Sequence, residues 1–428
     1  MTQPLRIGIA GLGTVGIGVL KILHEKKTLL EDRTGRSIEV TAISARTKSK
    51  DRGISLNSYV WEEDPIKLAQ RDDIDIFLEL MGGHEGAAYN ATRAAIAAGK
   101  DVITANKAML AHHGHKLALK SEENGSVIRF EAAVAGGIPV IKTLAEGLAG
   151  NQIIRVLGVM NGTCNYILTQ MQATGRGYEA LFKECAELGF LESDPNLDVG
   201  GIDAGHKLSL LSAIAFGTQV NFEEMEIEGI QCIELEDIEQ AADMGFRIKL
   251  LGVAQMTERG LEQRMSPCLV PQNSPIGQLE GGTNMVVLEG DEVGQIFLCG
   301  AGAGQGPTAS AVLSDIIELA RGTRMTTFGK PARIMQKAGS ASSLTRAAYY
   351  IRLRLLDKPG ALAKIATVLG KAGVSIDRMR QYGHQDKTAP VLIVTHKTLP
   401  QALTNALLKI PDTGVLDGTP VALRIENV

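Results

Sequence analysis

Apolar and polar positions along the first 135 residues follow an alternation of strands and helices. The segment LRIGIAGLGTVGIGVLKILHEK (5–26) contains a β-branched apolar run, then glycines, then apolar residues at helical spacing. Strand-like runs follow at 38–44, 74–80, 101–104 and 126–132, with a helix-like segment at 87–99. This alternation predicts an α/β domain with a parallel, doubly wound sheet, whose ligand lies at the carboxyl ends of the strands.

From about residue 136 the pattern changes to longer segments that mix strands and helices. We expect an α+β domain for substrate binding, catalysis and dimerisation over 136–300. The α/β domain over 1–135 is expected to be completed by about 300–330. There a glycine-rich turn precedes Thr308 and Ser310, which stand in good N-cap positions for a helix that returns to the first domain. A tight structural turn is the alternative.

Small and polar residues over 331–347 predict a linker. After it, the apolar runs over 348–428 recur in the order strand, helix, strand, strand, helix, strand. This βαββαβ order predicts a ferredoxin-like domain. It contains no acid–base constellation, so we expect it to bind a ligand or to regulate.

Length and composition narrow the class of protein. A chain of 428 residues is long enough for two or three domains. Its net charge of −4, with no basic block, argues against nucleic acid or a membrane surface as a partner. No run approaches the about 18 apolar residues of a membrane span, and no signal peptide is visible. Five widely spaced cysteines without a CxxC pair favour reduced thiols in a cytoplasmic protein.

The first candidate site is the glycine-rich turn after the opening strand. Gly11, Gly13 and Gly16 form G-x-G-x-x-G between strand and helix, with Thr14 and Val15 inside the motif. In this setting the glycines permit a tight turn, the approach of a pyrophosphate and close packing of helix on strand. We therefore predict dinucleotide binding, with a purely structural turn as the alternative.

The loop after the second strand reads SARTKSK and bears on the choice of cofactor. It lacks the acid that would bind an adenosine ribose, and it offers Arg46 and Lys48. Cationic side chains suit a 2′-phosphate, so the loop favours NADP, while NAD stays possible.

Two motifs stand where strands of the predicted sheet end. ELMGG (79–83) and TANK (104–107) follow the runs at 74–80 and 101–104, and they place Gly82 and Lys107 at the ligand-binding edge. Both are candidates for contact with the cofactor and the reacting carbon. A structural lysine at a strand end is the alternative for Lys107.

A cluster of acids stands in ESDPNLDVGGIDAGHKL (192–208). Glu192, Asp198 and Asp203 precede or begin a helix-like run, and Lys207 follows Asp203 by four residues. On a helix this spacing puts the last two side chains on one face. Considered alone, the stretch is equally typical of an acidic loop followed by a surface helix with an ordinary ion pair. Asp194, followed by proline, is typical of a turn.

Taken in order, these motifs resemble the homoserine dehydrogenase family, in its monofunctional form with a C-terminal ACT domain. The matching blocks extend over essentially the whole chain. They are GLGTVG, ELMGG, TANK, EAAVAGGIP (131–139), MNGTCNYIL (160–168), ESDPNLDVGGIDAGHKL, GAGAGQGPTASAV (300–312) and LDKPGALAKIATVLGKAGVSI.

The resemblance implies a Rossmann-type domain and the interconversion of L-aspartate 4-semialdehyde and L-homoserine with NAD(P). Lys207 matches the proton donor, Lys107 lies beside the nicotinamide, and Asp203 holds Lys207 in place. Substrate-binding matches are Glu192, Asp198, Asp203, Gly162 and Thr163, and further cofactor contacts are Gly189, Gly304 and Gly306. Phe190 stands where the family usually has tyrosine, which implies a modest change in substrate binding.

The resemblance also implies a monovalent-cation site for sodium or potassium and a regulated oligomer. Glu131 would supply a carboxylate, and Val134, Gly136 and Ile138 would supply backbone carbonyls. ACT domains bind small amino acids at paired interfaces, so L-threonine is the expected effector and a homodimer or homotetramer the expected assembly.

Two other functions remain open on the sequence. One is another Rossmann dehydrogenase, for example one that acts on aspartate itself, which the 192–208 stretch disfavours. The other is an inactive, NADP-responsive regulatory protein, which the presence of both Lys107 and Lys207 disfavours.

Overall fold

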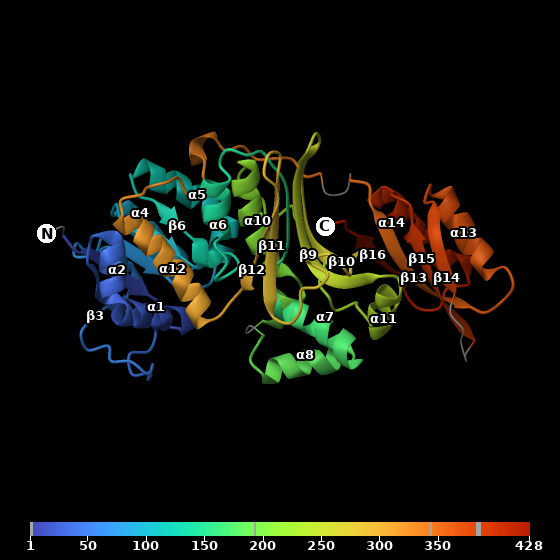
Figure 1. Ribbon diagram of the computed structural model, residues 1–428, viewed down its shortest axis with the longest axis horizontal. Coiled ribbons are helices and arrows are strands. Elements are labelled where there is room, and N and C mark those ends of the chain that lie inside the picture. The colour runs from blue at the N-terminus through green and yellow to red at the C-terminus, as the bar shows by residue number, and fades with distance from the viewer. Residues whose placement is uncertain (1–2, 192–193, 342–344, 382–386) are drawn as a thin grey trace.

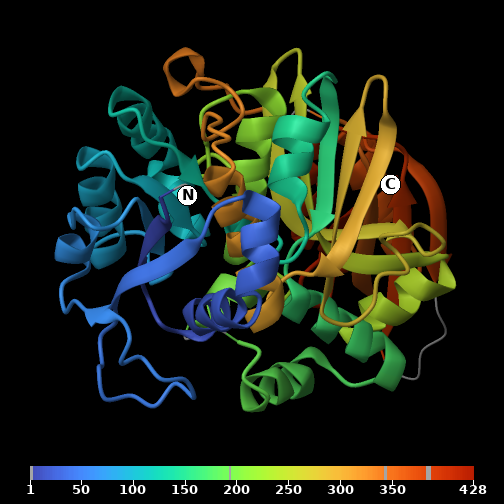
Figure 2. The ribbon, with the colours of Figure 1, turned by 60° about the vertical axis from the view of Figure 1, so that its left-hand side comes forward.

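The computed structural model describes residues 3–191, 194–341, 345–381 and 387–428. Figures 1 and 2 show an elongated molecule with a nucleotide-binding-type α/β unit at the N-terminal end. A large mixed sheet occupies the middle, and a small α/β unit forms the other end. In this described part, no helix combines the length and apolar character needed to cross a bilayer.

The N-terminal sheet has the strand order β3-β2-β1-β4-β5-β6, with every pair parallel. This order confirms the predicted Rossmann-type doubly wound sheet. Its strands are β1 (Leu5–Ala10), β2 (Ile38–Ser44), β3 (Val60–Trp61), β4 (Ile76–Glu79), β5 (Asp101–Thr104) and β6 (Ile128–Arg129). The run predicted at 126–132 contributes only two strand residues, because the chain turns there into a 3₁₀ helix, η1 (Glu131–Ala133).

Helices cover both faces of this sheet, and two separate apolar clusters fill the layers. One face carries α3 (Pro65–Ala69), α4 (Ala87–Ala97) and α5 (Lys107–Glu123). The other carries α1 (Thr14–Glu25), α2 (Lys27–Thr34) and α12 (Gln305–Ala320). α12 therefore returns from far along the chain and packs on the same face as α1 (Figure 1).

The start of α12 differs from the prediction. The N-cap is Gly304, which makes no side-chain cap, and Thr308 and Ser310 lie inside the helix. Close packing explains the earlier start, because a Cβ on Gly18 of α1 would lie 2.8 Å from the Gln305 side chain. The glycine lets the first turn of α12 press directly against α1.

The central sheet has the strand order β12-β11-β7-β9-β10-β16-β13-β15-β14, and β8 pairs with β10. Its strands before residue 330 are β7 (Ile153–Val159), β8 (Glu226–Ile227), β9 (Phe246–Thr257), β10 (Gly260–Pro271), β11 (Thr283–Gly290) and β12 (Gly294–Ala301). The helical segments of this region are α6 (Val140–Lys142), the π-helix η2 (Thr143–Gly147), α7 (Gly162–Thr174), α8 (Tyr178–Glu187), α9 (Pro195–Val199), α10 (Ile202–Phe216) and α11 (Leu235–Asp243). The mixture of strands and helices agrees with the expected α+β character.

The C-terminal unit follows a short 3₁₀ helix, η3 (Ala332–Ile334), and confirms the βαββαβ order. It consists of β13 (Ala348–Leu356), α13 (Ala361–Lys371), β14 (Ile376–Gln381), β15 (Thr388–Thr395), α14 (Pro400–Lys409), η5 (Pro411–Thr413) and β16 (Val421–Ile425). β16 pairs with β10 in parallel through Cys268 with Arg424 and Leu269 with Ile425. The C-terminal unit thus extends the central sheet.

A buried ion pair fastens the C-terminal unit to α11. Arg352 of β13 donates from Nε to Asp237 Oδ1 (2.6 Å) and from Nη2 to Oδ2 (3.1 Å). Tyr350 donates its hydroxyl to the same carboxylate at 3.2 Å. Arg352 is 3% exposed and Asp237 is fully buried. Arg352 also pairs with Glu234 and Glu236, but among the described residues Arg352 is the cation that contacts Asp237, so the buried Asp237 charge depends on it.

Arg352→Met is expected to lower the free energy of unfolding by about 3–5 kcal/mol, because it leaves the Asp237 charge buried without a cation. Arg354→Met is the matched control on the same strand. That arginine is exposed and pairs with Glu234 and Glu236, so its loss should cost less than about 1 kcal/mol. Urea unfolding of the three proteins checks this, and equal losses in both variants would contradict it.

Candidate active site

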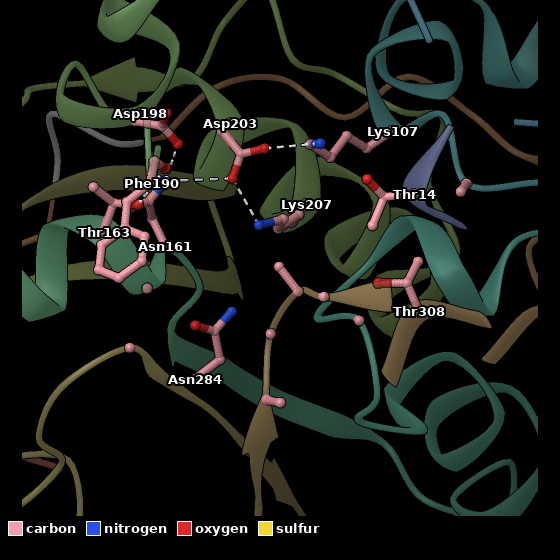
Figure 3. Close-up of a pocket in the computed structure, with 18 of the residues that line it drawn as sticks. Thr14, Lys107, Asn161, Thr163, Phe190, Asp198, Asp203, Lys207, Asn284 and Thr308 are labelled. Carbon is pink, nitrogen blue, oxygen red and sulfur yellow. Dashed lines mark hydrogen bonds and ion pairs between the residues drawn. The ribbon is translucent and has the colours of Figure 1, made fainter. Parts of the chain in front are cut away.

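A cavity of about 820 Å³ lies between the ligand-binding edge of the N-terminal sheet and the central sheet (Figure 3). Three helices begin at its wall, with Thr14 opening α1, Lys107 opening α5 and Gly162 opening α7. α9 and α10 bring the acidic stretch to the same space. Helix N-termini attract negative charge, so this cavity suits a ligand that carries both anionic and cationic groups.

Asp203 lies at the centre of the polar side chains in the cavity (Figure 3). Its Oδ2 accepts from Lys207 Nζ at 2.6 Å, and its Oδ1 lies 3.0 Å from Lys107 Nζ. Burial acts to raise the pKa of Asp203, but the two ammonium groups outweigh it and hold that pKa well below its usual range. The carboxylate stays ionised and keeps both lysines facing one space.

Lys207 is oriented by a second acceptor as well. Its Nζ donates to the Met160 carbonyl at 2.7 Å, and the residue is only 8% exposed. One turn of α10 separates it from Asp203, so the helical spacing predicted from the sequence is confirmed. With two of its N–H groups donated to Met160 and Asp203, the Lys207 ammonium has few directions left in which it can contact a ligand.

Lys107 stands at the first position of α5, where a helix disfavours a cation. Hydrogen bonds at the carboxyl ends of β4 and β5 fix the backbone that leads to this position. Asn106 caps the helix and donates Nδ2 to the Gly83 carbonyl at 2.7 Å. Buried Glu79 at the end of β4 accepts from the Thr104 hydroxyl at the end of β5 at 2.7 Å. These hydrogen bonds join the ELMGG and TANK segments. The Asp203 carboxylate across the cavity offsets the unfavourable position of the Lys107 ammonium at the helix N-terminus.

Asn161 links the two acids of the cavity. Its Nδ2 donates to Asp198 Oδ1 at 2.9 Å and to Asp203 Oδ2 at 3.5 Å, while its Oδ1 caps α7 through the Cys164 N–H at 2.8 Å. One amide therefore sets the spacing of two carboxylates and the direction of α7. Asp194, predicted to be a turn residue, serves as the N-cap of α9 and accepts from the Asn196 N–H at 3.1 Å.

His206 is packed behind the ion pairs instead of facing solvent. Its ring centroid lies 4.3 Å from that of Phe222 and 5.6 Å from that of His112. Burial and the neighbouring His112 lower the pKa of His206 to about 4, against the opposing pull of Asp203. The imidazole is therefore neutral at physiological pH and adds no third positive charge to the two lysines.

The glycine-rich turn has the shape that a dinucleotide pyrophosphate needs. Gly11 has φ +102°, and a Cβ there would lie 2.3 Å from the Leu80 carbonyl oxygen. A Cβ on Gly16 would lie 2.0 Å from the Gly11 oxygen, whereas one on Gly13 would meet nothing within 4 Å. The first and third glycines are thus required for packing, and the second borders open space in front of α1. The residues present fit a nucleotide cofactor.

The basic loop after β2 is tied to this turn by an arginine outside the predicted set. Arg52 donates to the Leu12 carbonyl at 3.2 Å and to the Thr47 carbonyl at 2.7 Å. The Lys48 ammonium and the Arg52 guanidinium lie 5.9 and 5.7 Å from the centre of the Trp61 ring. These contacts hold the loop that carries Arg46 beside the nucleotide turn.

Glu131 follows β6, begins the 3₁₀ helix η1 and is buried. Its carboxylate accepts from the Ile141 N–H at 2.9 Å and the Lys142 N–H at 3.0 Å. Burial, together with the nearby Asp315 carboxylate, raises the pKa of Glu131 to about 7. A cation beside this group would favour its ionised form.

The turn after Glu131 presents backbone oxygens. Within the described ranges, the Val134 and Gly136 carbonyls accept no backbone hydrogen bond, while that of Ile138 accepts from the Val140 N–H at 2.8 Å. Gly136 has φ +53°, and a Cβ there would lie 2.5 Å from the Gly302 oxygen. A carboxylate with two available carbonyls fits a hard monovalent cation, although one predicted ligand is already engaged.

The candidate residues do not all meet in one place. Those that line the cavity are Thr14, Val15, Lys107, Gly136, Gly162, Thr163, Gly189, Asp198, Asp203, Lys207 and Gly304. Gly82 lies at the rim of the sheet, where its N–H donates to Glu79 at 3.3 Å, and Gly306 lines a separate groove between α2 and α12. Glu192 lies outside the described residues.

Comparison with known proteins agrees with this geometry. The family model for homoserine dehydrogenase matches residues 139–317 of this chain. The family model for the homoserine dehydrogenase NAD binding domain matches residues 11–131. An ACT domain model matches 349–412. The homoserine dehydrogenase of Neisseria gonorrhoeae is 38% identical over 434 residues, which cover 100% of this chain and 99% of the relative.

The chain belongs to the homoserine dehydrogenase family.

Solved homoserine dehydrogenases share its fold. The enzyme of Thiobacillus denitrificans superposes with a TM-score of 0.94 at 38% identity, covering 99% of each chain. A hyperthermophilic archaeal homoserine dehydrogenase mutant in complex with NADPH superposes with a TM-score of 0.64 at 27% identity, covering 74% of this chain and 97% of that one. The nucleotide-binding domain and the C-terminal ACT domain predicted from the sequence are thereby confirmed.

Sequence reasoning missed three polar residues of this homoserine dehydrogenase site. Asn161 shows a weak signal, as a capping residue before a helix, and His206 shows none beyond its place next to Lys207. Asn284 is the second residue of β11 and lines the cavity, yet no motif marks it. Asn161 and His206 acquire their roles from partners distant in the sequence.

His206→Gln is expected to flatten the pH dependence of stability. The pKa of His206 is about 4 in the fold and 6.5 in the reference state, so the unfolded chain binds more protons between these values. The contribution of neutral His206 to the free energy of unfolding is therefore complete above pH 6.5 and is lost as the pH falls toward 4. Between pH 7 and 5 the wild type should lose about 2 kcal/mol more than the variant, measured by urea unfolding. The prediction would be contradicted if the free energy of unfolding changed with pH in the same way in the variant and in the wild type.

Proposed function

We propose that this chain is a homoserine dehydrogenase that interconverts L-aspartate 4-semialdehyde and L-homoserine in the biosynthesis of threonine, isoleucine and methionine. The observation that carries the proposal is the Asp203 carboxylate held between Lys207 and Lys107, next to the nucleotide turn. The family membership supports the same reaction. A zwitterionic substrate with a reducible carbonyl needs acids for its ammonium and cations for its reacting oxygen, and the cavity offers both.

The bound nicotinamide would supply or accept the hydride, while the side chains of the protein would manage charge and protons. Lys207 Nζ gives a proton to the oxygen of the substrate during reduction and takes it back during oxidation. Lys107 Nζ, on the other side of Asp203, polarises the same oxygen and stabilises its negative charge. Asp198 and, from the family resemblance, Glu192 bind the substrate ammonium, with Gly162 and Thr163 beside it.

NADP is the proposed cofactor, with NAD as the alternative. The support is the cationic loop with Arg46 and Lys48, which Arg52 holds against the glycine-rich turn. A guanidinium and an ammonium suit a 2′-phosphate, and the SARTKSK segment provides no acid for a free ribose hydroxyl.

Further parts of the proposal rest on the family resemblance. Sodium or potassium is proposed at Glu131, Val134, Gly136 and Ile138. The domains are proposed as 1–135 with 300–330, 136–300, a linker at 331–347, and 348–428. We also propose a cytoplasmic homodimer or homotetramer.

The first experiment is the initial rate of L-homoserine oxidation with NADP and NAD in parallel. Lys207→Met removes the proton donor at similar volume, so kcat should fall at least about 100-fold while NADPH affinity, measured by fluorescence titration, stays within about 2-fold. Lys120→Met, on the exposed face of α5, is the control and should behave as wild type. Wild-type protein that binds NADPH but does not oxidise homoserine would sink the proposal.

L-Threonine is expected to inhibit this oxidation through the ACT domain. The support is the continuity of the ACT sheet with the central sheet through β16 and β10, which gives the effector a structural route to the catalytic region. Rates are measured against threonine concentration, with serine and valine as controls, and the assembly is followed by light scattering. Unchanged rate and unchanged assembly would remove threonine as the effector.

A further inference from the structure

Glu79 is a buried acid at the ligand-binding edge of the N-terminal sheet. It is the last residue of β4, and its side chain is fully buried. The next residue, Leu80, packs against the glycine-rich turn, because a Cβ on Gly11 would lie 2.3 Å from the Leu80 carbonyl oxygen. The Glu79 carboxylate therefore lies directly behind the sheet edge at which a dinucleotide is expected.

Three uncharged donors hold the Glu79 carboxylate. Its Oε1 accepts from the Met81 N–H at 2.7 Å and from the Gly82 N–H at 3.3 Å, and its Oε2 accepts from the Thr104 hydroxyl at 2.7 Å. Burial raises the pKa of Glu79, and these hydrogen bonds, which favour the ionised form, act against that rise. The donors fix the carboxylate in one position and suit an anion.

Glu79 differs from the buried acids Asp203 and Asp237 in having no cation beside it. Asp203 is paired with two lysines and Asp237 with Arg352. Among the described residues, Glu79 forms no ion pair, and every hydrogen bond to its carboxylate comes from an uncharged group. A buried anion without a counter-ion is unfavourable, so a cation that reached this edge of the sheet would be attracted to it.

The path of a bound dinucleotide would bring such a cation to this edge. β1 and β4 are neighbours in the sheet, and the turn after β1 suits the pyrophosphate. The cationic loop with Arg46 would bind the adenosine half on the β2 side, so the nicotinamide half would extend over the ends of β4 and β5. Figure 3 shows Thr14 of α1 and Lys107, which follows β5, on the same side of the cavity. An oxidised nicotinamide ring is positively charged, whereas a reduced ring is neutral.

We propose that Glu79 sets the preference of the site for the oxidised over the reduced form of the nicotinamide cofactor. Its fixed negative charge attracts the positive ring of NADP⁺ and acts much less on the neutral ring of NADPH. Glu79 does not line the cavity, so it acts through its charge and not by contact. This inference rests on the proposed homoserine dehydrogenase function and adds a residue that determines its cofactor binding.

The test measures the dissociation constants of NADP⁺ and NADPH by calorimetry on the whole chain. Glu79→Gln removes the charge at nearly the same volume and keeps an oxygen for the Met81 and Gly82 N–H groups. The Kd for NADP⁺ should rise about 10-fold, while the Kd for NADPH changes less than about 2-fold. Glu79→Asp keeps the charge, so its ratio of the two constants should stay within about 3-fold of the wild-type ratio.

Asp101→Asn is the matched control on the same sheet. Asp101 begins β5 at the opposite edge and is paired with Arg324, so the ratio of the two constants should equal that of the wild type. Thermal unfolding is measured for every variant. If Glu79→Gln does not fold, Thr104→Val decides. Loss of the hydroxyl donor favours the neutral acid and should shift the ratio in the same direction by about 3-fold.

The outcomes separate this inference from the proposed function. An unchanged ratio in the folded Glu79→Gln protein, or equal weakening of both nucleotides, overturns the role of Glu79 alone. Wild-type protein that binds neither nucleotide overturns the proposed function and this inference with it. The rate of L-homoserine oxidation by the wild type reports on the proposed function independently of the ratio.

Discussion

A single carboxylate shared by two ammonium groups organises this molecule. Asp203 meets Lys207 across one helical turn and Lys107 across the boundary between the two sheets. Burial would favour a neutral acid, but two cations at about 3 Å outweigh that cost, so the ionised form persists. Each lysine in turn depends on the carboxylate for its position. Loss of the acid would leave two like charges facing each other in a partly buried space.

The fold brings these charges together by converging helix starts on one cavity. α1 and α5 start from the edge of the N-terminal sheet, and α7 starts after β7 of the central sheet. Their N-termini are electropositive, which offsets the acids of α9 and α10 and makes a zwitterion a better guest than a simple cation or anion. α12 then closes the arrangement, because it packs on α1 after the chain has formed strands β7 to β12 of the central sheet (Figure 2).

The central sheet also connects the site to the C-terminal unit. β10 pairs with β9 on one side and with β16 of the ACT domain on the other, and the buried Arg352–Asp237 pair fixes α11 against β13. Movement of the ACT domain would therefore strain hydrogen bonds and an ion pair that are hard to replace. The continuous sheet runs from the ACT domain to β11, which carries Asn284, and to β12.

Local patterns in the sequence determined the periodic elements, the glycine-rich turn and the Asp203–Lys207 spacing, because each depends on neighbours a few residues away. These local patterns did not show the early start of α12, the short β6 or the contact of Arg52 with the glycine-rich turn. Tertiary structure alone decided that Lys107 meets Asp203, that Asn161 joins two acids, and that Asn284 is buried without a partner. Those contacts join residues tens to hundreds of positions apart, and only the packing of the sheets sets such distances.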